Sequence, residues 1–107
     1  MSSEQTSSIQ EQPMRIILPK LYQAITNKLE EQHNIHPYDI QAKVQTDTSG
    51  YQVIVYFGDG FAHKESHYFS NEAIENMNHN VIEFIEKIGD ACKEVMIADY
   101  FKMMRPK

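Results

Sequence analysis

Histidine is the residue type whose spacing first suggests chemistry, because five histidines occur in 107 residues. His63 and His67 are four apart and follow Asp59, and imidazole nitrogens and carboxylates are ordinary zinc ligands. On a strand, residues four apart are separated by roughly 13 Å, too far for two ligands that each lie about 2 Å from one zinc. His33 and His36 lie in a predicted loop with no cysteine or acidic cluster to complete a ligand set. We therefore expect no metal site and no cofactor.

The single cysteine, Cys92, is the other candidate for chemistry. It lies beside the apolar stripe of the last predicted helix, where a cysteine packs as a small apolar residue. Lys87 and Lys93 would favour a reactive thiolate, but acidic residues are interspersed with them and no histidine base is near in the sequence. One cysteine cannot form an internal disulfide, so we expect a packed thiol in the reducing cytoplasm. We predict no catalytic residue and a protein that is not an enzyme.

The longest predicted helix extends from Asn71 to Met104, where apolar residues recur at alternating spacings of three and four. Ser70 is placed to cap its first turn, and Pro106 prevents its continuation. Gly89, with Asp90, marks a position where the helix could break. Unbroken, it would be roughly 50 Å long, about twice the length of an eight-residue strand. The stripe consists of Ile74, Met77, Val81, Phe84, Ile88, Ala91, Val95 and Ala98.

The rest of the chain predicts one more helix and three strands, and hence an α+β fold in the order α-β-β-β-α. Apolar residues at helical spacing place the first helix at Leu18 to Gln32. The strand from Tyr38 to Gln45 alternates apolar and polar residues, and its apolar set, Tyr38 included, should face the core. The run from Tyr51 to Phe57 is apolar on both faces and should be central. After the turn signal at Gly58, the more polar run from Phe61 to Phe69 completes an antiparallel meander packed by both helices.

The N-terminal residues, 1–12, are mostly Ser, Thr, Gln and Glu, a composition that predicts a disordered tail. Met14 to Leu18 is apolar enough for a short strand, and it also fits a lead-in to the first helix. Residues 13–107 are enough for one hydrophobic core and too few for two. We therefore expect a single α+β domain after the tail.

The net charge of −5 disfavours phosphate-rich partners and anionic membrane surfaces, and no apolar run approaches the length of a membrane span. The predicted order of elements resembles that of the double-stranded RNA-binding domain. That family uses lysines at the start of its last helix to contact phosphates. The corresponding residues here include Glu72 and Glu75. We therefore expect no nucleic-acid partner and no membrane partner.

The C-terminal half of the long helix carries apolar residues around most of its circumference, more than one sheet face can cover. Pairing with a second copy would cover the remainder, so we expect a homodimer or docking of another protein at this helix. A break at Gly89 would instead fold the segment back onto a monomer. The predicted partner interface consists of Ile88, Val95, Met96, Ile97, Phe101 and Met104.

A further alternative is a small-molecule binder or small enzyme that uses the polar face of the sheet. Such a function needs polar groups that converge in a concave site. The sequence offers one such set, in which Ile54, Tyr56, His63 and His67 are expected to share the polar face.

Overall fold

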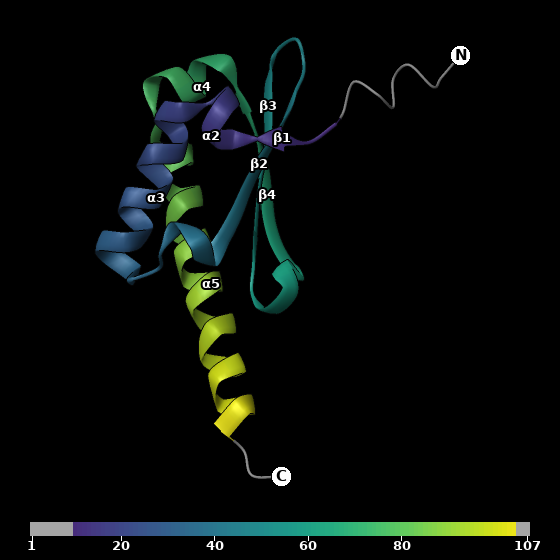
Figure 1. The fold of residues 1–107 in the computed structure, drawn as a ribbon. Helices are drawn as coiled ribbons and strands as arrows, with labels where there is room; N and C mark the ends of the chain where they lie inside the picture. Colours follow the sequence, from purple (N-terminus) through teal and green to yellow (C-terminus); the bar gives the residue numbers. More distant parts are fainter. Residues whose placement is uncertain (1–9, 105–107) are drawn as a thin grey trace.

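The computed structural model describes the backbone of residues 10–104 and the side chains of residues 10–101 (Figure 1). Most of the predicted tail therefore lies outside the described residues. Two short 3-10 helices, Pro37–Asp39 and Asp59–Phe61, accompany the main elements. The main helices and strands, in chain order, are β1 (Gln12–Pro13), α2 (Met14–Ile17), α3 (Pro19–His33), β2 (Ile40–Thr46), β3 (Gly50–Phe57), β4 (His63–Ser70), α4 (Asn71–Asn76) and α5 (His79–Met104).

The strands form one antiparallel sheet in the order β1-β2-β3-β4, with α3 and α5 on the same side of it (Figure 1). This confirms the predicted α+β class, and β3 lies between β2 and β4 as predicted. Strand β1 is an addition to the predicted meander. It pairs Gln12 with Val44 and Pro13 with Lys43, so the sheet begins within the sequence expected to be a tail.

The core lies between the sheet and the helices. Alternate β3 residues Val53, Val55 and Phe57 point into it, as the period of a strand requires. Ile54 is buried on the opposite face of the sheet. Helices α3 and α5 cover the inner face with Leu21, Ile25, Leu29, Val81, Phe84, Ile85, Ile88 and Cys92.

The predicted core position of Tyr38 is wrong. Pro37 opens a 3-10 turn in which the side chain of Asp39 accepts a hydrogen bond from the backbone N–H of His36, at 2.9 Å. This turn delays the start of β2 to Ile40 and leaves 77% of Tyr38 exposed. Tyr38 instead stacks on the ring of His36, with centroids 5.2 Å apart.

The predicted long helix is two helices, and this part of the prediction is also wrong. Ser70 caps α4 as expected, since its hydroxyl accepts from the N–H of Ala73 at 3.1 Å. The helix ends at Asn76, and the next residue, Met77, has a left-handed φ of 48°. The side chain of Asn78 accepts from the N–H of Asn80 at 3.0 Å and begins α5 as an N-cap does.

Helix α5 continues through Gly89, so the alternative break at that residue does not occur. Gly89 instead makes room for a side chain of α3. An added Cβ would overlap the imidazole of His33, so the missing side chain permits the close approach of α3 and α5.

The segment from Met14 to Ile17 is a single helical turn, α2, which leads into α3, so of the two alternatives for this segment the strand is wrong. The N–H of Leu18 donates to the carbonyl of Met14 at 2.7 Å. Because Met14 is fully buried, the turn anchors the start of α3 to the core. Helix α3 begins with Pro19 and ends at His33, and the next residue, Asn34, has a left-handed φ of 58°.

Candidate functional site

The largest group of neighbouring exposed apolar side chains lies on the C-terminal half of α5. Exposure rises along the helix, from 36% for Met96 and 48% for Ile97 to 58% for Tyr100 and 62% for Phe101. These four residues are called the α5 surface below. Figure 1 shows why they are uncovered, since this end of α5 extends past the sheet and past α3.

The α5 surface begins where the support of the sheet ends. Val95 is half-buried and lies against the β3–β4 turn, where a Cβ added to Gly58 would come within 3.0 Å of its Cγ1. Beyond Val95 the two rings of Tyr100 and Phe101 pack edge to face, with centroids 5.8 Å apart. Aromatic rings in contact with each other and with water are typical of surfaces that bind proteins.

The structure divides the predicted interface residues between core and surface. Ile88 is fully buried and Val95 is half-buried, whereas Met96, Ile97 and Phe101 are exposed together. The side chain of Met104 lies outside the described residues. Tyr100 is missing from the predicted set, although its position three residues after Ile97 places it on the same side of the helix.

A shallow groove of about 290 Å³ adjoins the α5 surface where α3 ends. Its α3 side is fixed by the contact between His33 and Gly89, and its floor includes Ile35, which is buried. The groove widens the apolar region from one helix face to the junction of two helices. It is lined by His33, Asn34, Ile35, Lys93, Met96, Ile97 and Tyr100.

The predicted convergence on the polar sheet face is wrong, because its members lie on opposite faces. His67 is paired with Val53, and directly opposed residues in antiparallel strands share a face, so His67 points toward the helices. His63 likewise stacks on Phe57, with centroids 5.9 Å apart. On the other face, the hydroxyl of Tyr56 donates to the carboxylate of Glu11 at 2.8 Å, and this hydrogen bond raises the pKa of Tyr56.

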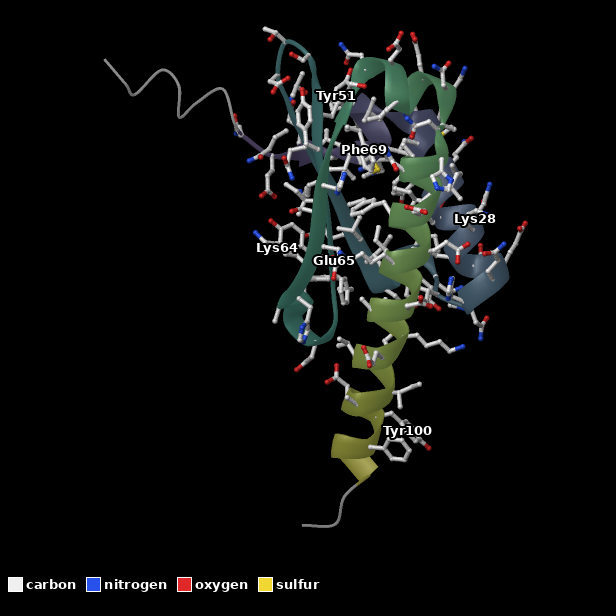
Figure 2. All side chains as sticks on the ribbon, turned by 180° about the vertical axis from the view of Figure 1, so that it is seen from behind. Lys28, Tyr51, Lys64, Glu65, Phe69 and Tyr100 are labelled. Carbon is white, nitrogen blue, oxygen red and sulfur yellow. The ribbon has the colours of Figure 1, made fainter. Side chains whose placement is uncertain are left out.

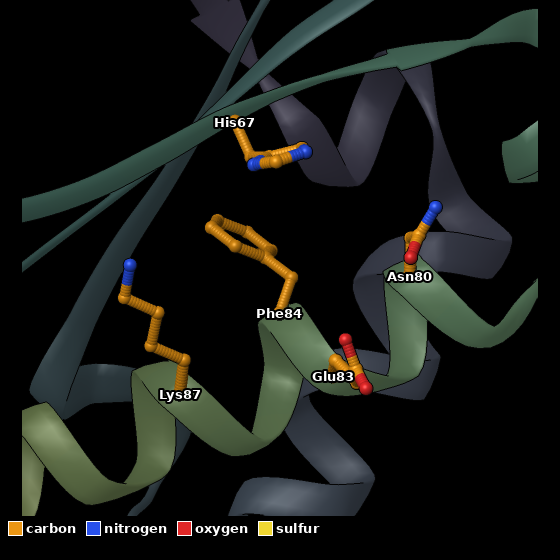
Figure 3. A pocket seen from close by; sticks show the side chains of 5 residues that line it. All are labelled: His67, Asn80, Glu83, Phe84 and Lys87. Carbon is orange, nitrogen blue, oxygen red and sulfur yellow. The ribbon is translucent and has the colours of Figure 1, made fainter.

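His67 instead lines a polar cleft between β4 and α5, with a volume of about 250 Å³ (Figure 3). Its ring lies over Phe84, with centroids 5.9 Å apart. Lys87 pairs with Glu65 at 3.5 Å, and Glu83 pairs with His79 at 2.9 Å. The cleft is lined by His67, Asn80, Glu83, Phe84 and Lys87.

Within residues 10–104, no three His, Cys, Asp or Glu residues are grouped so that they could hold a metal ion. Cys92 is fully buried, and burial, together with the negative charge of Asp39, raises the pKa of its thiol to about 11. A thiol of that pKa is protonated at neutral pH and is a poor nucleophile.

A mostly apolar cavity of about 330 Å³ lies where α2 and α3 meet the break between α4 and α5. Met77 contributes to its wall because the left-handed residue turns the chain there. Lys20 and Glu75 are the charged residues of its lining. The other lining residues are Ile17, Leu18, Pro19, Leu21, Ile74 and Met77.

Among the described residues, no helix has the length and hydropathy needed to cross a membrane. Comparisons of the sequence with models of protein families, with curated proteins and with solved structures gave no match.

Proposed function

We propose that this chain is a non-enzymatic interaction protein of the cytoplasm that associates with a second copy of itself through the α5 surface. The observation that carries the proposal is the exposure of Met96, Ile97, Tyr100 and Phe101 on one helix end that the sheet does not cover. Removing the exposed apolar area of these four side chains from water would favour association, because burial of a fully exposed large apolar side chain contributes about 1.5–3 kcal/mol.

A twofold arrangement suits this surface because the same residues then supply both halves of the contact. Two α5 helices that cross antiparallel would place the rings of Tyr100 and Phe101 against the partner's aliphatic side chains. The polar residues beside the α5 surface, among them Asp90, Lys93 and Glu94, would form the rim. A different protein that presents an apolar helix would use the same surface.

The test is the solution mass, measured by light scattering at two protein concentrations, of the wild type and of Ile97→Asp/Phe101→Asp. We expect a mass above that of the monomer for the wild type and a reduced mass for the variant, because each carboxylate would be desolvated in the contact. The far-UV circular dichroism should stay unchanged, since both positions are exposed in the folded monomer.

The matched control is Gln23→Glu/Asn27→Asp, which adds the same charge at two exposed positions of α3. Its mass should equal that of the wild type. A wild type that is monomeric at tens of micromolar would disprove self-association through the α5 surface. An equal loss of mass in the control would show that charge alone is responsible.

A further inference from the structure

Strand β4 is the exposed edge of the sheet. It is eight residues long, His63–Ser70, and pairs with β3 on one side only among the described residues. Apart from Glu65 and Phe69, all its residues are exposed. The strand at the other end of the sheet, β1, has only two residues. A long edge strand presents unpaired backbone groups to which another strand can add.

The hydrogen-bond pattern shows which residues of β4 present those groups. The N–H of Asn71 donates to the carbonyl of Ser49 at 3.0 Å, which extends the β3–β4 register by one pair. Hydrogen-bonded pairs alternate along an antiparallel ladder, so the odd-numbered residues of β4 bond to β3. The backbone groups of Lys64, Ser66 and Tyr68 therefore point away from the sheet.

We propose that β4 pairs antiparallel with β4 of a second copy, about a twofold axis at Ser66, to form one continuous sheet. In this register three residues of each strand, Lys64, Ser66 and Tyr68, exchange backbone hydrogen bonds with the partner. The occupant of the edge is a second copy because the side chains of β4 complement one another when the strand is reversed.

The complementarity holds on both faces. On the inner face Glu65 lies opposite the partner's His67, a carboxylate beside an imidazole, and His63 lies opposite the partner's Phe69. On the outer face Lys64 lies opposite the partner's Tyr68, and an ammonium over an aromatic ring is favourable. Ser66, which is small, meets itself at the axis.

The neighbouring registers lack this match. Directly opposed residues must share a face, so the axis can move only in whole residues along β4. An axis at Glu65 sets the two Glu65 carboxylates against each other, and an axis at His67 sets the two imidazoles together. Charged residues on an edge strand normally prevent pairing. In the register centred on Ser66 neither Glu65 nor Lys64 meets a residue of like charge, whereas an axis at Glu65 opposes two carboxylates.

Helix α5 supports the same arrangement. The cleft residues Asn80, Glu83 and Lys87 lie on the side of α5 away from α3, next to the free edge of β4 (Figure 3). Figure 2 shows Lys64, Glu65 and Phe69 along the strand that runs beside this helix. A twofold axis at Ser66 would place the two clefts, each lined by Glu83 and Lys87, on the same side of the continuous sheet.

The decisive experiment is oxidative cross-linking of Ser66→Cys. Opposed residues of a hydrogen-bonded antiparallel pair have Cα atoms about 5.5 Å apart, within the range of a disulfide. The matched control is Lys64→Cys, whose counterpart in the second copy would be roughly 13 Å away along the strand. Cys92 is buried and serves as the internal negative control in the wild type.

We expect covalent dimers from Ser66→Cys under mild oxidation, on a non-reducing gel and by mass spectrometry, and none from the wild type or Lys64→Cys. Equal cross-linking of Ser66→Cys and Lys64→Cys would show random collision, and absence of cross-linking from Ser66→Cys would show that no copy occupies this edge. Either result overturns the proposal.

The second experiment uses Ser66→Pro, which removes an N–H that points away from the sheet and so leaves the hydrogen bonds between β4 and β3 intact.

The proposed pairing of β4 with β4 is separate from the α5 surface, and the two contacts are tested independently. In the Ile97→Asp/Phe101→Asp background a dimer should remain, and Ser66→Pro should convert it to a monomer with unchanged circular dichroism. If the Ile97→Asp/Phe101→Asp variant is already monomeric, the β4 contact is disproved. If the Ile97→Asp/Phe101→Asp variant has the same solution mass as the wild type while Ser66→Cys cross-links, the α5 proposal fails and the β4 proposal stands.

Discussion

The thiol of Cys92 shows how position overrides residue type. Its sulfur lies 3.7 Å from the sulfur of Met96, and no part of the side chain reaches water. Burial disfavours the charged thiolate, and the carboxylate of Asp39 disfavours it further, so the pKa rises from 9.0 to about 11. The sequence correctly predicts a packed cysteine from its place beside the apolar stripe.

Native protein should therefore react with a thiol reagent at pH 8 on the order of a hundredfold more slowly than protein unfolded in urea, because the thiolate fraction falls tenfold for each unit of pKa. The measurement is the rate of labelling with an aromatic disulfide, with Cys92→Ala as the blank. Equal rates in the two states would contradict the burial of Cys92.

The same shift makes stability depend on alkaline pH. The folded-state pKa lies above the unfolded value, so the contribution of Cys92 is complete below about pH 9 and is lost as pH rises toward about 11. Urea unfolding at these two pH values should show a decline in the free energy of unfolding that Cys92→Ala lacks.

At the scale of elements, the imidazole of His33 on α3 lies against Gly89, the one glycine inside α5. Alanine at position 89 gains about 1 kcal/mol of helix propensity but meets the imidazole of His33. The two effects oppose each other in the wild type and can be separated by a double-mutant cycle.

We expect Gly89→Ala to destabilise the protein when His33 is present and to stabilise it by about 1 kcal/mol in a His33→Ala background. Denaturant unfolding of the four proteins measures the coupling. Additive effects in the cycle would mean that the two residues do not touch.

The pattern of the sequence predicts the class, the first helix and all three long strands, because apolar periodicity is a local property. It misses the break at Met77 because methionine is an ordinary helix former, and nothing local requires its positive φ. Asn78 offers a signal that can be recognised afterwards, since asparagine is a preferred N-cap. Strand β1 is missed because a two-residue strand has no period.

The candidate site is predicted only in part for a related reason. Ile97 and Phe101 are exposed as expected, while Ile88 belongs to the same helix but faces the core. The sheet register, which places His63 and His67 on the inner face, follows from pairing between strands and not from either strand alone. Which residues of α5 are left uncovered depends on where the sheet ends, and that position is known only from the structure.

At the scale of the whole molecule, the net charge and the first turn of α4 bear on the alternative of duplex RNA binding. The order of the long elements is that of the RNA-binding domain, and Glu72 lies in the first turn of α4. The charge at this turn is opposite to that required for phosphate contact.

We expect no gel shift of duplex RNA at any salt concentration, and no rescue at low salt, where electrostatic attraction is strongest. Glu72→Lys/Glu75→Lys is the informative comparison, because a shift in this variant alone would show that the fold presents the helix correctly and lacks only the charge. A shift of the wild type at moderate salt would contradict the expectation.

The order of the strands has a consequence for how the chain folds. Strands β2, β3 and β4 are neighbours in both sequence and space, so the meander closes only short loops. The contact between His33 and Gly89 must bring together residues that are far apart in the chain, and the entropy of loop closure delays such contacts. We expect the hairpins to be formed in the transition state for folding and α5 to dock afterwards. Substitutions in the hairpins would then slow folding, whereas those at the contact of α3 with α5 would mainly accelerate unfolding.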